Sequence, residues 1–154
     1  MPIQQVIIRS QARAAKFKAE LKDKPIYLIR IFDNPKWLTL TPYAELKYPE
    51  HFQIIRSYTF DDIDRPVGNQ VLFKDEIAEQ IITDFENQGT DCQTLLVHCR
   101  AGISRSSAVA IALCEIFHLQ TPEQIADMKK RFFAYNHRIY NTLLDVSKKM
   151  AVLT

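Results

Sequence analysis

The chain has 154 residues, of which 47% are hydrophobic and 25% are charged, and its formal net charge is +2. This length allows one domain with a hydrophobic core and is too short for two, so we expect a single domain over 1–154. The nearly balanced charge, without a run of five or six like charges, argues against nucleic acid as a partner.

The first half of the chain is predicted to form three strands and one helix. Runs rich in β-branched and aromatic residues indicate strands at 5–9, 26–32 and 52–60. Ser10 is suited to cap a helix that continues to about Lys22, with Phe17 and Leu21 on its apolar face. The segment 33–49 contains three prolines and three aromatic residues, and we expect an irregular connection whose aromatic side chains pack over the sheet edge.

The second half is predicted to form one more strand and four helices. Hydrophobic periodicity indicates a strand at 94–98 and helices at 73–87, at 104–119, from 121 onward and at 137–150. Strands that alternate with helices imply an α/β fold with a central, mostly parallel sheet of four to five strands and helices on both faces. In such a sheet, ligands bind at the carboxyl ends of the strands.

The cysteine count and the hydropathy indicate where the protein works. No apolar run reaches the ~20 residues of a membrane span, and the N-terminus lacks the pattern of a signal peptide. Three cysteines are an odd, low number, typical of a reducing cytoplasm. We expect Cys92 and Cys114 to be packing residues; a disulfide with an oxidised Cys99 is the alternative. Because no Cys/His grouping has ligand spacing, we expect no metal.

The junction between the fourth strand and the next helix carries the chemistry. A turn from a strand into a helix gathers backbone N–H groups and the positive end of a helix dipole around one point, which binds anions. Cys99 lies at the floor of this turn, and Arg105 follows it at the start of the helix. The same groups that would hold a phosphate also favour the thiolate form of Cys99, and Arg105 can offer two parallel N–H donors to phosphate oxygens.

Three neighbours of Cys99 are expected to support this turn. Gly102, one of only three glycines, stands where the backbone needs freedom from a Cβ atom. Ser106 can cap the helix or donate its hydroxyl to the sulfur. Because adjacent strand residues point to opposite faces, His98 is expected to point away from the sulfur and to support the loop through a backbone hydrogen bond.

The nine residues 98–106, HCRAGISRS, resemble the signature loop of the cysteine-dependent protein tyrosine and dual-specificity phosphatases. The resemblance implies the phosphotyrosine phosphatase fold, a phosphocysteine intermediate on Cys99 and no cofactor. It also implies a phosphorylated protein or peptide as substrate, and we expect a monomer. The implied phosphate-binding residues are Arg100, Ala101, Gly102, Ile103, Ser104 and Arg105.

A leaving alkoxide or phenoxide needs a proton from a neutral carboxylic acid, and the carboxylate can afterwards take a proton from water. Three candidates, Asp61, Asp62 and Asp64, follow the third predicted strand and lie 35 to 38 positions before Cys99. In the phosphatase family the general acid is an Asp on a loop about that far upstream. The residues 60–63, FDDI, also resemble the acid loop of small bacterial members, which favours Asp62, then Asp61, then Asp64.

Several alternatives remain open at this stage. A phosphoinositide or nucleotide phosphatase on the same fold is disfavoured because only Arg100 adds charge within the loop. Other cysteine chemistry, as in arsenate reductases or rhodanese-like domains, lacks a second acidic loop in this place. A non-catalytic phosphate-binding adaptor would not need Cys99, Arg105 and a candidate acid together. The basic run 129–131 is interpreted as a solvated face, with docking of an acidic substrate segment as the alternative.

Overall fold

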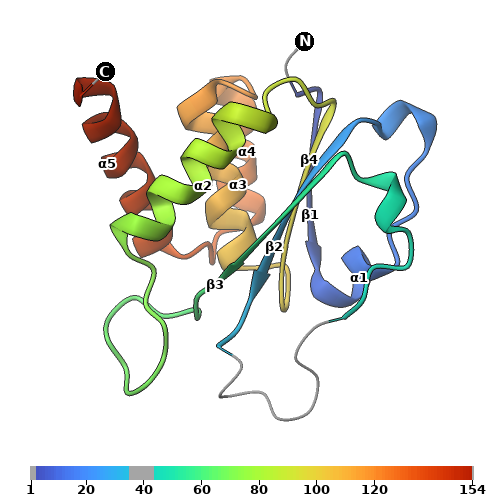
Figure 1. The fold of residues 1–154 in the computed structure, drawn as a ribbon. Helices are drawn as coiled ribbons and strands as arrows, with labels where there is room; N and C mark the ends of the chain where they lie inside the picture. The colour runs from blue at the N-terminus through green and yellow to red at the C-terminus, as the bar shows by residue number, and fades with distance from the viewer. Residues whose placement is uncertain (1–2, 35–43, 154) are drawn as a thin grey trace.

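The computed structural model describes residues 3–34 and 44–153, and the described strands form one parallel sheet (Figure 1). The sheet has the order β1-β4-β2-β3, and every pair of neighbours is parallel. Its strands are β1 (Gln5–Ser10), β2 (Ile26–Phe32), β3 (Ile54–Thr59) and β4 (Thr94–Cys99). The predicted α/β class with a parallel sheet is therefore confirmed.

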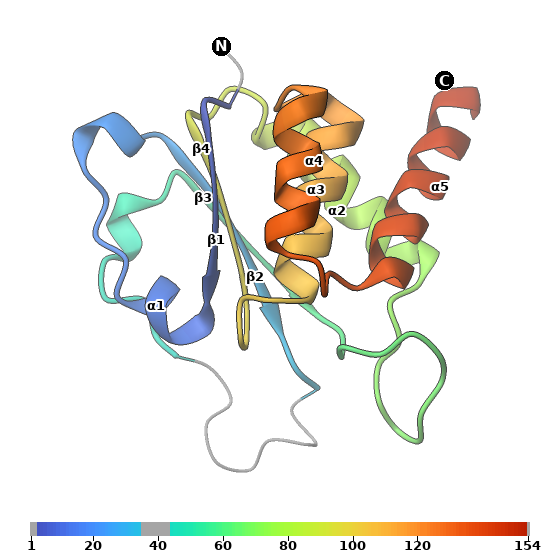
Figure 2. The same cartoon turned by 180° about the vertical axis from the view of Figure 1, so that it is seen from behind.

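Helices cover the two faces of the sheet unequally (Figures 1 and 2). One face carries the four long helices α2 (Asp75–Gln88), α3 (Arg105–Phe117), α4 (Pro122–Arg131) and α5 (His137–Leu153). The other face carries the short helix α1 (Gln11–Ala15) and two 3-10 helices, η1 (Leu21–Asp23) and η2 (Pro49–His51). Among the described helices, none is long and apolar enough to cross a membrane.

Burial on both sides explains why β2, β4 and α3 have nearly continuous hydrophobic sequences. All seven residues of β2 and all six of β4 are buried, because central strands of a parallel sheet are covered on both sides. Residues that alternate along β4 join different cores: Leu95 and Val97 pack under the long helices, and Leu96 packs near α1. Helix α3 lies between the sheet and α5, and it is buried continuously from Arg105 to Cys114.

The predicted helix from Ser10 to about Lys22 is wrong in its extent, because α1 ends at Ala15. In a longer helix the carbonyl of Ala15 would accept a hydrogen bond from the amide of Ala19. Instead, the Ala15 carbonyl accepts from Lys47 N at 2.8 Å, and Ala19 N donates to His51 Nδ1 at 3.0 Å. Leu21 is consequently 89% exposed. Most of the predicted connection 33–49 lies outside the described residues, which resume at Ala44.

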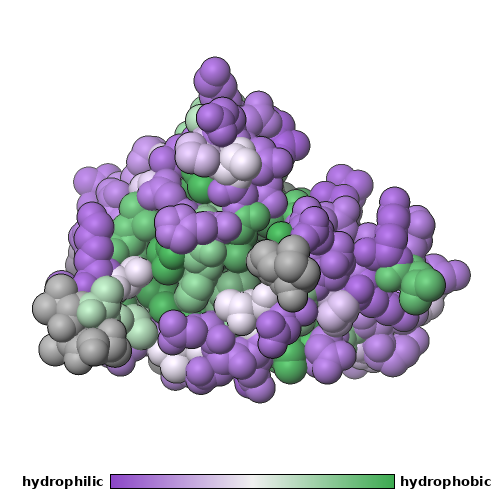
Figure 3. Space-filling view, turned by 90° about the horizontal axis from the view of Figure 1, so that it is seen from above, coloured by the Kyte–Doolittle hydropathy of each residue, from purple (hydrophilic) through white to green (hydrophobic). Residues whose placement is uncertain are grey.

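The sheet order brings the predicted site to one end of the molecule. β4 lies between β1 and β2, so Cys99 is paired with Ser10 at the carboxyl edge, where α3 also begins. Figure 3 shows the opposite end from above, where hydrophobic side chains gather at the centre and hydrophilic side chains surround them. The candidate site therefore lies at the carboxyl ends of the strands, as expected for this type of sheet.

Candidate active site

The loop 100–104 forms a tight turn that is packed against the end of β1. Gly102 has a φ of +74°, and a Cβ atom at this position would lie 2.5 Å from both Arg9 C and Ser10 N. The backbone of Gln11 also donates to the carbonyl of Arg100 at 3.2 Å. Glycine is therefore required twice, for its positive φ and for the close approach of two backbones.

Cys99 lies at the base of this turn, only 2% exposed. Its Sγ accepts a hydrogen bond from Gly102 N at 3.3 Å and lies 3.2 Å from Ser106 Oγ. Burial raises the pKa of the thiol, but the hydroxyl and backbone N–H of Ser106, the charge of Arg105 and the N–H of Gly102 together hold this pKa below its usual value. The surroundings of Cys99 therefore favour the thiolate.

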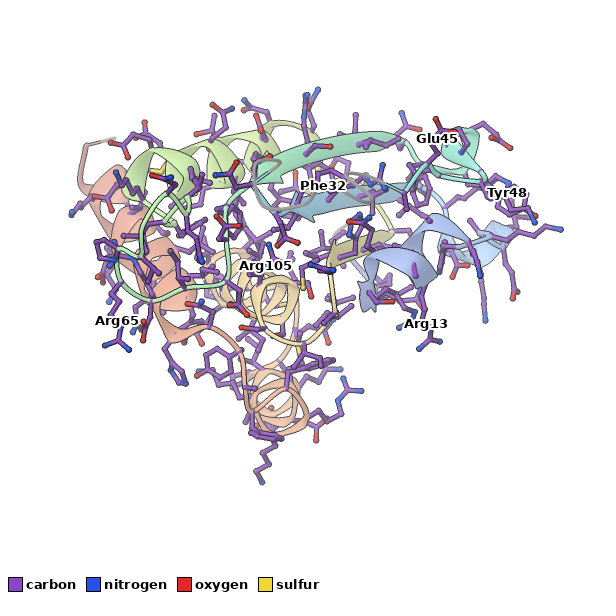
Figure 4. The ribbon with its side chains drawn as sticks, turned by 90° about the horizontal axis from the view of Figure 1, so that it is seen from below. Arg13, Phe32, Glu45, Tyr48, Arg65 and Arg105 are labelled. Carbon is purple, nitrogen blue, oxygen red and sulfur yellow. The ribbon has the colours of Figure 1, made fainter. Side chains whose placement is uncertain are left out.

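Arg105 is buried, and its guanidinium is anchored through a single nitrogen. Nη1 donates to Asp33 Oδ1 at 2.7 Å and to the carbonyl of Phe60 at 2.9 Å. Nε and Nη2, which share one edge of the guanidinium, have no partner among the residues described. That edge can donate two parallel hydrogen bonds to a tetrahedral oxyanion. Figure 4 shows Arg105 near the centre of this face, with Arg13 on one side and Arg65 on the other.

Asp33 is a site residue that the sequence analysis missed. It follows β2 directly, and its side chain is 15% exposed between Arg105 and Arg100, whose Nη1 lies 3.7 Å from Oδ2. A buried guanidinium needs a compensating charge, and Asp33 supplies it. The sequence does place Asp33 directly after a predicted strand. The same criterion selected the three carboxylates after β3 as candidates and would also have selected Asp33.

Asp62 lies next to the turn. Its Oδ1 accepts hydrogen bonds from Ser104 Oγ at 2.8 Å and from Asn136 Nδ2 at 2.9 Å. The Ser104 hydroxyl therefore contacts Asp62, and its side chain does not cap α3. Three segments far apart in the sequence meet here: the loop after β3, the turn after β4 and the connection between α4 and α5.

The other two candidate acids occupy different surroundings. Asp61 is 6% exposed, and its two carboxylate oxygens accept from Asn34 N at 3.0 Å and Val71 N at 2.7 Å. Asp61 thus ties both ends of its loop to the body of the protein. Asp64 is exposed and pairs with its neighbour Arg65 at 3.5 Å. Of the three, Asp62 is the one with a hydrogen bond to the turn.

His98 is fully buried and is held by a residue that sequence reasoning missed. Its Nε2 accepts from Arg30 Nε at 2.9 Å, so the proton of the neutral ring is on Nδ1. Burial, followed by the charge of Arg30, lowers the pKa of His98 to about 4. Arg30 lies directly opposite His98 in the register of β2 and β4. Nδ1 is buried and has no hydrogen-bond partner in the described part of the chain, so the backbone hydrogen bond expected for His98 is not observed and the contact with the Arg30 side chain takes its place.

The remaining cysteines are separated from Cys99 along the chain by stretches of strand and helix. Cys92 is seven residues earlier, which corresponds to about 20 Å of extended chain, and Cys114 follows Arg105 by nine residues, about 14 Å of helix. A disulfide needs Cα atoms within about 7 Å. Burial raises the pKa of Cys114 to about 12. All three cysteines are free, and this geometry favours the packing role for Cys92 and Cys114.

The basic run at the end of α4 is largely neutralised by its own surroundings. Lys129 pairs with Glu115 at 3.2 Å and donates to Tyr140 Oη at 2.9 Å. Arg131 pairs with Asp127 at 3.5 Å, which leaves Lys130 exposed. This pairing favours a solvated face over a docking site for an acidic segment.

Comparison with known proteins identifies the fold. No protein-family model matches the chain, and no curated protein matches it. Human DUSP28 superimposes with a TM-score of 0.57 at 17% identity, covering 97% of this chain and 95% of that one. PTPMT1 in complex with PI(5)P gives 0.54 at 12%, with 96% and 93% covered, and Tk-PTP in the active form gives 0.51 at 14%, with 96% and 92% covered.

These structures show that the chain has the fold of the tyrosine and dual-specificity phosphatases. The fold implied by HCRAGISRS is therefore confirmed. The narrower likeness to small bacterial members receives no support from the comparisons.

Proposed function

We propose that this protein is a cysteine-dependent phosphatase that hydrolyses phosphate monoesters, and that its substrates are phosphorylated proteins or peptides. One observation carries the proposal: a single turn surrounds a Cys99 sulfur of lowered pKa and also presents the free edge of Arg105. A nucleophile and an oxyanion site in one place are what an in-line displacement at phosphorus requires.

In the first step, the thiolate of Cys99 attacks phosphorus on the side opposite the ester oxygen. The bond from Sγ to phosphorus forms, and the bond from phosphorus to the ester oxygen breaks. Neutral Asp62 gives its proton to the departing oxygen, while the backbone amides of 100–105 and the guanidinium of Arg105 bind the three equatorial oxygens. The products are a phosphocysteine, the alcohol or phenol, and the carboxylate of Asp62.

In the second step, water replaces the sulfur. The carboxylate of Asp62 takes a proton from the attacking water, and the new phosphorus–oxygen bond forms while the bond from Sγ to phosphorus breaks. This regenerates the Cys99 thiolate and releases inorganic phosphate. Ser106 lies 3.2 Å from the sulfur and can stabilise the departing thiolate by donating its hydroxyl proton in a hydrogen bond. Cys99, Arg105, Asp62 and Ser106 therefore form the proposed catalytic set.

A phosphoinositide is the second candidate substrate, because the structurally similar PTPMT1 was solved in complex with PI(5)P. Within the turn, however, the exposed charge comes from Arg100 alone, and Asp33 partly neutralises it at 3.7 Å. A multiply charged headgroup would be bound better by additional cations. This favours a singly phosphorylated side chain. A panel of phosphopeptides and phosphoinositide vesicles distinguishes the two, and a preference for the vesicles would reverse the assignment.

The proposal is tested by hydrolysis of p-nitrophenyl phosphate across pH, with and without a chelator. We expect Cys99→Ser to be inactive and Arg105→Lys to lose most activity, because lysine has no pair of parallel donors. We expect the chelator to have no effect. With phenyl phosphate, whose poor leaving group needs the acid, only Asp62→Asn should lose the dependence on a protonated acid, and Asp61→Asn and Asp64→Asn should keep it. Activity that survives in Cys99→Ser would refute the mechanism.

A further inference from the structure

We propose that Asn136 is a positioning residue that fixes the orientation of the Asp62 carboxyl group relative to the phosphate-binding turn. This inference rests on the proposed function, since it names a residue that would set the efficiency of proton transfer to the leaving group. Asn136 stands just before α5, 74 positions after Asp62 and 37 after Cys99.

Asn136 connects three parts of the site through its backbone and its side chain. Its backbone N–H donates to the carbonyl of Ser104 at 3.1 Å, which fastens this connection to the phosphate-binding turn. Its Nδ2 donates to Asp62 Oδ1 at 2.9 Å and to the Ile63 carbonyl at 3.2 Å. Its Oδ1 accepts from Ile139 N at 3.0 Å, which caps α5. The side-chain amide thus donates twice and accepts once.

Two donors converge on one oxygen of Asp62. Ser104 Oγ donates to Oδ1 at 2.8 Å, and Asn136 Nδ2 donates to the same atom. An oxygen that accepts two hydrogen bonds cannot conveniently carry the acidic proton as well. The proton of neutral Asp62 is therefore directed to Oδ2, which has no hydrogen bond within 3–34 and 44–153. Asn136 and Ser104 together consequently select which oxygen delivers the proton, and Asn136 is the donor that comes from outside the phosphate-binding turn.

The loop does not need Asn136 for its attachment. Asp61 already fastens both ends of the loop through Asn34 N and Val71 N, and Asp61 is buried. The contacts of Asn136 are additional: one is made to the Asp62 carboxyl group itself and one to the neighbouring Ile63 carbonyl. This separation of tasks predicts that loss of the amide disturbs proton transfer more than it disturbs the fold.

The residue type matters because an amide is the side chain here that both donates to Asp62 and caps α5. Aspartate has the same shape and can accept from Ile139 N, but it cannot donate when ionised and would place a second negative charge beside Asp62. Serine can also cap the helix but is too short to reach Asp62. Asn136→Ser and Asn136→Asp therefore keep the helix cap and remove the amide's contacts with Asp62 and with the Ile63 carbonyl.

The test compares substrates with leaving groups of different acidity. A general acid matters for phenyl phosphate, whose phenoxide is a poor leaving group, and much less for p-nitrophenyl phosphate or a fluorinated umbelliferyl phosphate. We expect Asn136→Ser to lower kcat/KM for phenyl phosphate by about tenfold or more, since general acid catalysis contributes roughly 100-fold to 10,000-fold. The ratio kcat/KM reports the steps up to formation of the phosphocysteine, in which Asp62 acts as the acid, and with the fluorinated substrate it should change less than about twofold.

Two controls separate positioning from a structural effect. Asn141→Ser removes an exposed asparagine from α5, the helix that Asn136 caps, and should leave the hydrolysis of both substrates unaffected. In the Asp62→Asn background, Asn136→Ser should have no further effect on phenyl phosphate, because the acid that it orients is already gone. Asn136→Asp should show the same substrate dependence as Asn136→Ser.

Equal losses of kcat/KM on both substrates, or an undiminished loss in the Asp62→Asn background, would overturn the positioning role and leave the proposed phosphatase intact. Full activity of both Asn136 variants on phenyl phosphate would overturn it as well. A wild-type chain that hydrolyses none of these esters would instead overturn the proposed function, and the role of Asn136 with it.

Discussion

Substitution of Gly102 by alanine tests whether the shape of the turn creates the site. The residue has a φ of +74°, a region that costs an L-amino acid about 1–2 kcal/mol. The new Cβ would also lie 2.5 Å from Arg9 C and Ser10 N and 2.7 Å from Arg9 O. These are backbone atoms of β1, so they cannot rotate away, and overpacking of this kind typically costs about 1–3 kcal/mol more. The total predicted loss of unfolding free energy is therefore about 2–5 kcal/mol.

The same change should displace Gly102 N, which donates to Cys99 Sγ at 3.3 Å. Gly68→Ala is a matched control, because Gly68 has a φ of +50° but a Cβ there would meet no atom within 4 Å. We expect Gly68→Ala to cost about 1–2 kcal/mol and to keep full activity. Gly102→Ala should lose most of its kcat/KM and require a higher pH for alkylation of Cys99 by iodoacetamide. Unchanged alkylation and activity in Gly102→Ala would refute this reading of the turn.

Three further predictions follow from buried ionisable groups near the site. Asp33→Asn should lower kcat/KM at least tenfold and lower the unfolding free energy measured in urea by about 3 kcal/mol, because the buried Arg105 loses its ionic partner. The exposed control Asp64→Asn should change neither quantity, and equal effects of the two variants would contradict the role of Asp33. The pKa of His98 is lowered to about 4 in the folded state, whereas the unfolded chain binds this proton near pH 6.5, so the unfolding free energy should fall by about 2 kcal/mol between pH 7.5 and pH 5. A His98→Gln variant that keeps the same pH dependence would exclude His98 as its source. Asp61→Asn should cost about 1–3 kcal/mol in thermal or urea unfolding because an amide can accept only one of the two backbone N–H bonds, and a leaving-group dependence in this variant would point instead to a catalytic role.

The parts of the fold that sequence reasoning predicted are those encoded locally. The alternation of strands and amphipathic helices gave the α/β class, and Thr121 with Pro122 marked the start of α4, where the capping box is present. The turn between Cys99 and Arg105 is likewise continuous in sequence, so the nucleophile and the guanidinium could be placed together from the strand-to-helix junction and from the resemblance of 98–106 to the signature loop.

The parts that sequence reasoning missed depend on contacts between distant segments. Asp33, Arg30 and Asn136 reach the site from other elements, at separations of 72, 68 and 74 residues from Arg105, His98 and Asp62 respectively. The early end of α1 has the same origin, because the groups that complete its hydrogen bonds come from 47 and 51. Local propensity could not reveal these partners, since each depends on strand order and register.

The central claim is that Cys99 accepts the phosphoryl group during turnover. The most direct measurement is mass spectrometry of peptides from acid-quenched reactions, with p-nitrophenyl phosphate as substrate and Asp62→Asn used to slow the hydrolysis of the intermediate. We predict that the peptide containing Cys99 gains one phosphoryl group, and that Cys99→Ser does not. Turnover by the wild-type protein without phosphorylation of Cys99 in either protein would contradict the mechanism.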